Sequence, residues 1–128
     1  MSDELWRKGA LELAALIAKG EVSSTEVVRA HLDRIDQVNP QLNAVVRRLD
    51  DHAVAAAAEA DRRRASGEPL GTFHGVPFTI KENIDVAGTP TTSGIPALAE
   101  AVSPTDSPAV ERLRLLGAIP LARTNLPD

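Results

Sequence analysis

The first half of the chain carries its hydrophobic residues at the spacing of α-helices. An apolar stripe over residues 11–17, followed by Gly20, predicts a first helix with a natural stop. Ser23 and Glu26 match the capping box that opens a second helix. Asn39-Pro40 is predicted to end that helix, because the residue before a proline avoids the helical region. The apolar side of the second helix comprises Val27, Val28, Leu32, Ile35 and Val38.

A short strand and a long helix are predicted next. Residues 44–46, Ala-Val-Val, suit a short strand. From Asp50 to Ala65 the chain is rich in alanine, the strongest helix former. Arg62–Arg64 lie in the last turn of this helix, where they complement the helix dipole. Residues 66–71 combine Ser, Gly and Pro, and this loop is the best internal boundary of the chain.

Behind that loop the pattern changes from helix to strand. Val76, Phe78 and Ile80 alternate with Pro77, Thr79 and Lys81, the period of two that is typical of a strand. A loop rich in Gly and Thr is predicted over residues 86–93.

One more helix and one more strand complete the pattern. Ser107-Pro108 reads as an N-cap followed by a proline in the first turn, and Gly117 ends the helix. The side of this helix that is predicted to be buried comprises Val110, Leu113 and Leu116. A strand is predicted over residues 118–122, and Pro120 should place it at a sheet edge or break its ladder. Strand, helix and strand in this order predict an α/β fold.

Composition narrows the picture. The 128 residues are 43% hydrophobic but only 2% aromatic, so the core should rest on Ala, Val, Leu and Ile. The formal net charge of −4 argues against nucleic acid as a partner. There is no cysteine, and His31, His52 and His74 have no ligand spacing, so we expect no metal site. His31 is predicted to be a packed histidine.

Nothing in the sequence pattern suggests export or a membrane. The chain opens Met-Ser-Asp-Glu, without a basic segment followed by an apolar one, which argues against a secretory signal. Its apolar stretches are far shorter than a membrane span. We therefore expect a cytoplasmic protein without a membrane partner.

Lys81 is the most unusual position for chemistry. It ends a run without charges, Gly75 to Ile80, and the alternation places it on the same side as Thr79 and Pro77. Burial disfavours the charged form of a lysine, and a neutral lysine can act as a general base. A lysine at a strand end is, however, more often a solvated charge. The residue alone leaves both readings open.

The segment around Lys81 favours the role of a base. Residues 75–88, Gly-Val-Pro-Phe-Thr-Ile-Lys-Glu-Asn-Ile-Asp-Val-Ala-Gly, closely resemble the lysine segment of the amidase signature family. The resemblance covers nearly the whole chain in the family's order. It includes residues 11–14, 22–24, 39–44, 89–94, 109–113 and 117–127.

The resemblance implies the N-terminal part of the amidase signature fold, with helices followed by the first strands of a mixed sheet. It implies hydrolysis of a carboxamide to a carboxylate and ammonia or an amine, without a cofactor. Lys81 would be the base of a triad with a serine in a cis peptide and a nucleophilic serine. Thr91, Thr92 and Ser93 match a loop near the substrate cleft, although ordinary loop chemistry explains them equally well.

Both serines of the family belong to a Gly-Gly-Ser-Ser-Gly-Gly-type segment, which residues 1–128 do not contain. Ser23-Ser24 has no flanking glycines, and helix capping explains it. Ser103 and Ser107 read as turn and cap residues. We therefore expect an incomplete amidase domain that is inactive alone. Its helical part would span residues 1–65, and the start of its α/β core would span residues 72–128.

Three alternatives stay open. The first is the A subunit of a glutamyl-tRNA amidotransferase, although Asn125-Leu126-Pro127-Asp128 favours a general amidase, since that subunit usually lacks this proline. The second is a non-catalytic product of a truncated or split gene, with the missing C-terminal part as a separate partner chain. The third is a helical interaction module on residues 1–65, which would expose an apolar stripe.

Overall fold

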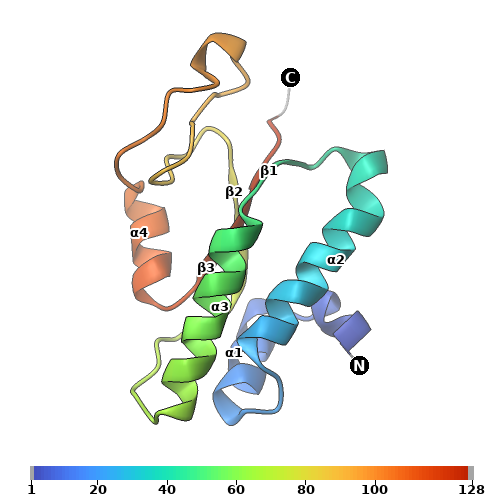
Figure 1. The fold of residues 1–128 in the computed structure, drawn as a ribbon, viewed down its shortest axis with the longest axis vertical. Helices are drawn as coiled ribbons and strands as arrows, with labels where there is room; N and C mark the ends of the chain where they lie inside the picture. Colours follow the sequence, from blue (N-terminus) through green and yellow to red (C-terminus); the bar gives the residue numbers. More distant parts are fainter. Residues whose placement is uncertain (1, 127–128) are drawn as a thin grey trace.

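The protein is an arrangement of helices on a small sheet, seen in a computed structural model that describes residues 2–126 (Figure 1). The first half comprises the 3-10 helix η1 (Ser2–Arg7), α1 (Ala10–Lys19), α2 (Ser24–Leu42), β1 (Val45–Arg48) and α3 (Asp50–Ala65). The second half comprises β2 (Pro77–Lys81), the 3-10 helix η2 (Pro96–Leu98), α4 (Pro108–Leu115) and β3 (Ile119–Thr124).

The three strands form one mixed sheet in the order β1-β3-β2. β1 is antiparallel to β3, and β2 is parallel to it. Figure 1 shows α4 on one side of the strands and α2 on the other. The predicted α/β class, with a helical front followed by the first strands of a mixed sheet, is confirmed.

The core consists of small and aliphatic side chains, as the composition predicts. One cluster joins the helices α2 and α3 to β3 through Val28, Leu32, Ala57, Ile119 and Leu121. A second joins η1, α1 and α2, and a third joins β2 to α4. Leu13 and Ile17 of the predicted stripe pack inside the chain, whereas Leu11 at its start is 70% exposed.

The start of α2 follows the prediction, and its end does not. Glu26 N donates to Ser23 Oγ at 3.0 Å, and Ser23 N donates to the Glu26 carboxylate at 3.0 Å, so the capping box is confirmed. The helix continues past the predicted end at Asn39-Pro40 and closes at Asn43, which has φ +50. The helix continues beyond Pro40 although that residue lacks an N–H to donate, and Asn43 N still donates to Asn39 O at 2.7 Å.

Pro120 lies in the central strand, so the predicted edge position is wrong. The alternative, a broken ladder, is confirmed, because the register with β2 shifts between Phe78 and Thr79, beside the Phe78–Pro120 pair. β1 pairs with β3 only from Ala122 onward, so the missing donor of Pro120 faces no β1 residue.

The apolar side of α4 is shorter than predicted. Val110 is buried, but Leu116 is 38% exposed because the helix ends at Leu115 and Leu116 lies in its C-cap. Gly117 follows with φ +94, which fits its predicted role as the stop.

Candidate active site around Lys81

Lys81 is the last residue of β2 and pairs with Thr124, the last residue of the parallel strand β3. Its neighbour Ile80 is buried against Val86 and Val110. Because successive side chains of a strand point to opposite faces, Lys81 lies on the other face with the exposed Thr79. The Lys81 side chain is half-buried.

The backbone after Lys81 is held on both sides. Lys81 O accepts from Ile84 N at 3.1 Å, which closes a tight turn directly after the strand. Glu82 N donates to Thr124 O at 3.0 Å, so the turn stays attached to the end of β3. A second turn follows, in which Thr89 N donates to Val86 O at 3.1 Å.

Thr91, Thr92 and Ser93 return to the residue that follows Lys81. Ser93 N donates to Glu82 O at 3.2 Å, and Thr92 Oγ1 accepts from Gly94 N at 3.1 Å. Thr91 Oγ1 is buried and has no hydrogen-bond partner among residues 2–126. The structure thus brings the loop of the three candidate residues beside the turn that carries Lys81.

Arg123 is the residue at this end of the sheet that the sequence reasoning missed. Its side chain is fully buried, and its two terminal nitrogens donate to four oxygen atoms of residues 81–90. Burial lowers the pKa of the Arg123 guanidinium, while the negative charges of Glu82 and Asp85 act in the opposite direction. The one signal in the sequence was an arginine directly after the apolar stretch 118–122.

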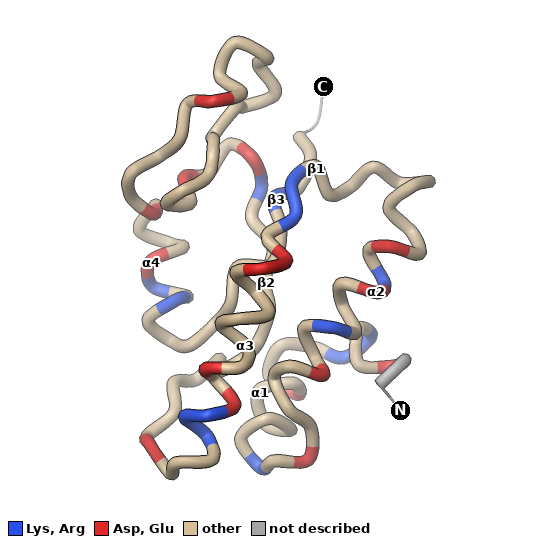
Figure 2. Tube along the Cα trace, viewed as in Figure 1, with Lys and Arg blue, Asp and Glu red and all other residues tan. Residues whose placement is uncertain are grey.

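Cationic residues occupy adjacent positions of all three strands near Lys81. The register places Arg47 of β1 opposite Arg123, and Ile80, the neighbour of Lys81, on the other side of Arg123. Figure 2 shows the Lys and Arg positions of the strands gathered at one end of the sheet.

The serines predicted to be structural all have structural partners. Ser23 caps α2, and Ser24 Oγ donates to Gly75 O at 2.7 Å. Ser103 Oγ donates to Thr105 O at 2.8 Å, and Ser107 caps α4. The side chain of Asn125 donates to Asn43 O at 3.0 Å. Pro127 and Asp128, which favoured a general amidase, lie outside the described residues.

Histidines and acidic groups outside this end form no metal cluster within residues 2–126, where no group of three or more His, Cys, Asp or Glu side chains comes together. His31 is half-buried, and its Nδ1 lies 2.7 Å from Val27 O, as expected of a packed histidine. Across the same residues, no helix is long and apolar enough to cross a membrane.

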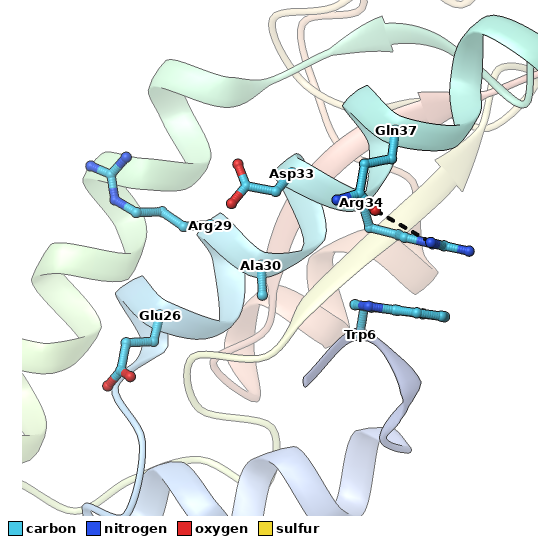
Figure 3. A pocket seen from close by; sticks show the side chains of 7 residues that line it. All are labelled: Trp6, Glu26, Arg29, Ala30, Asp33, Arg34 and Gln37. Atoms are coloured by element: carbon cyan, nitrogen blue, oxygen red, sulfur yellow. Dashed lines mark hydrogen bonds between the residues drawn. The ribbon is translucent and has the colours of Figure 1, made fainter. Parts of the chain in front are cut away.

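A cavity of about 530 Å³ lies away from Lys81, between η1 and α2. Figure 3 shows Arg34 stacked over the Trp6 ring, and the Arg34 guanidinium carbon lies 3.9 Å from the ring centre. Arg34 Nη1 also donates to Gln37 at 3.3 Å. The charged side chains that line this cavity carry both signs, and Lys81 is not among them. It is lined by Trp6, Glu26, Arg29, Ala30, Asp33, Arg34 and Gln37.

Comparisons with known proteins agree on one family. The family model described as Amidase matches residues 26–128. An indoleacetamide hydrolase of Bradyrhizobium diazoefficiens is 48% identical, over 97% of this chain and 24% of that protein. The A subunit of the glutamyl-tRNA(Gln) amidotransferase of Salinispora tropica is 44% identical, over 93% of this chain and 24% of that protein.

Solved structures show the same likeness. The structure of a bacterial aryl acylamidase of the amidase signature family aligns with a TM-score of 0.88 at 35% identity. The alignment covers 94% of this chain and 25% of that one. The chain therefore spans about a quarter of the length of the proteins that it matches.

Proposed function

Because the chain belongs to the amidase family, we propose that it is the part of an amide hydrolase that carries the catalytic lysine, Lys81. The observation that carries the proposal is the position of Lys81 at the end of β2. There its backbone is bound by Ile84 N and Arg123, and the loop of Thr91–Ser93 is attached to the next residue. Thr91, Thr92 and Ser93 are proposed to lie near the substrate.

In the proposed reaction, the neutral amine of Lys81 takes a proton through a bridging serine from a nucleophilic serine. The nucleophile attacks the carboxamide carbon, and the C–N bond breaks as the leaving amine takes the proton back from Lys81 through the bridging serine. Water then hydrolyses the acyl ester to the acid and frees the serine. Both serines are proposed to come from a Gly-Gly-Ser-Ser-Gly-Gly-type segment outside these residues. Residues 1–128 would then form the front of one domain, with a helical part over residues 1–65 and the start of the core over residues 72–128.

The proposed substrate is a linear carboxamide. Similarity to an indoleacetamide hydrolase and an aryl acylamidase supports this class. Similarity to the A subunit of a glutamyl-tRNA(Gln) amidotransferase keeps glutamine as the second candidate. A partner chain that carries the serines and a cytoplasmic location remain predictions, as do the absence of a cofactor and of nucleic-acid or membrane partners.

The test measures ammonia release by the 128-residue chain alone and by the same chain followed by a serine segment of the family. Arylacetamides, aliphatic amides and glutamine with charged tRNA are the substrates. We expect turnover of simple amides only with the serine segment, and loss of this turnover in Lys81→Ala. Turnover by the isolated chain would contradict the need for the serines. Turnover of glutamine with charged tRNA, without turnover of the other amides, would favour the amidotransferase.

A further inference from the structure

The guanidinium of Arg123 binds the segment that follows Lys81 at four points. Nη2 donates to Lys81 O at 3.3 Å and to Ile84 O at 2.6 Å. Nη1 donates to Thr89 Oγ1 at 2.6 Å and to Pro90 O at 2.9 Å. One side chain of β3 thus contacts both ends of the segment 81–90.

These four contacts fall on two successive turns. Nη2 binds the two carbonyls of the turn that begins at Lys81 and ends at Ile84. Nη1 binds the end of the turn from Val86 to Thr89 and the residue after it. The planar fork of an arginine can reach both turns at once, whereas the single ammonium of a lysine acts as one point charge.

Packing alone does not account for an arginine at this position. The side chain is fully buried, and its hydrogen bonds go to carbonyl and hydroxyl oxygens rather than to a carboxylate. Burying a charge without an ionic partner is costly, so a hydrophobic residue would serve a purely structural role better. The compensating gain is the fixed geometry of the two turns.

We propose that Arg123 is a positioning residue for Lys81. Its fork holds both turns against β3, so that the Lys81 backbone leaves β2 in one orientation. The adjoining loop is held as well, because Ser93 N donates to Glu82 O within the same arrangement. The proposal rests on the proposed function for its catalytic consequence, but not for its structural part.

The structural part is tested by amide hydrogen exchange on the 128-residue chain. Arg123→Lys keeps the charge and loses the fork. We expect the amides of Ile84 and Thr89 to exchange at least about tenfold faster, since several charge-assisted hydrogen bonds are lost. Leu13 of α1, whose core cluster includes no residue of β3, should change by less than about twofold, because local openings are independent of the global one. Equal acceleration at all three amides, or none, would overturn the proposal.

A second pair of variants keeps the test decisive if Arg123→Lys does not fold. Thr89→Val removes the hydroxyl that accepts from Arg123 Nη1, whereas Thr89→Ser retains it. We expect Thr89→Val to speed exchange at residue 89 by about fivefold or more, and Thr89→Ser to leave it unchanged. Equal exchange in the two variants would overturn the proposal.

The catalytic consequence is tested in the chain joined to its serine segment. Arg123→Lys should lower kcat by about tenfold and leave KM within about twofold, because it misplaces the base without touching the substrate. An unchanged kcat in Arg123→Lys, with Lys81→Met inactive, overturns the positioning role and leaves the proposed function intact. An active Lys81→Met overturns the proposed function, and the exchange result then decides the positioning role alone.

Discussion

Gly117 should not tolerate a side chain, for a backbone reason and a packing reason. Substitutions at two other glycines measure these two effects one at a time. Gly117 has φ +94, in the left-handed region, and a Cβ there would lie 2.7 Å from His74 Cα. His74 cannot easily withdraw, because its N donates to Gly71 O at 3.1 Å and its Nε2 lies 2.8 Å from Ala60 O. Gly75 N also donates to Gly117 O at 2.9 Å, in the contact that aligns the start of β2 with β3.

Gly117→Ala therefore meets two penalties. A left-handed backbone costs a residue with a Cβ about 1–2 kcal/mol. Forcing an atom into a packed contact adds about 1–3 kcal/mol. Gly67→Ala isolates the first penalty, because Gly67 has φ +79 and no heavy atom within 4 Å of the added Cβ. Gly71→Ala isolates the second, because its Cβ would lie 2.6 Å from Leu116 C without a positive φ.

Urea unfolding followed by circular dichroism measures the three variants against the parent chain. We expect Gly117→Ala to lose about 2–5 kcal/mol of unfolding free energy, with a midpoint lowered by about 1 M or more. Its loss should approach the sum of the losses in Gly67→Ala and Gly71→Ala. A loss no larger than that of Gly67→Ala would show that the contact with His74 is not tight, and would refute this reasoning.

Two further predictions concern the helices. The Asp61 carboxylate of α3 accepts from Ser24 N at 2.7 Å and from Thr25 N at 3.1 Å, at the start of α2. Asp61→Ala should therefore lower the free energy of unfolding in urea by about 2 kcal/mol. A loss no larger than about 0.5 kcal/mol, as for an ordinary surface substitution, would contradict this role. On α4, Val110 is 2% exposed and Leu115 is 76% exposed. In thermal unfolding, Val110→Ala should therefore cost about 2 kcal/mol and Leu115→Ala less than about 0.5 kcal/mol. Equal costs would contradict the packing of α4.

Local patterns in the sequence were enough to predict the elements. Ser23 and Glu26 predicted the start of α2, and the alternation around Lys81 predicted β2, because capping and side-chain periodicity depend on residues close in sequence. The end of α2 was missed at Pro40. The tendency of proline to end a helix was outweighed there by the cap at Asn43, whose left-handed geometry the sequence alone did not reveal.

Contacts between distant segments could not be predicted in the same way. The strand order places Pro120 in the centre of the sheet, and no local pattern states which strands become neighbours. Asp61 binds a helix end 37 residues away, and Arg123 binds oxygens at residues 81–90. Whether a charged residue such as Arg123 is buried depends on its hydrogen-bond partners, and these lie far from it in the sequence.

The role of Lys81 as the base is tested most directly by one kinetic comparison. In the chain joined to its serine segment, kcat for a simple amide is measured for the parent and for Lys81→Met. Glu82→Gln, at the adjacent half-buried position, serves as the control. General base catalysis predicts a loss of about 10²–10⁴-fold in Lys81→Met and a change of less than about threefold in Glu82→Gln. A kcat for Lys81→Met within about threefold of the parent would contradict the assignment.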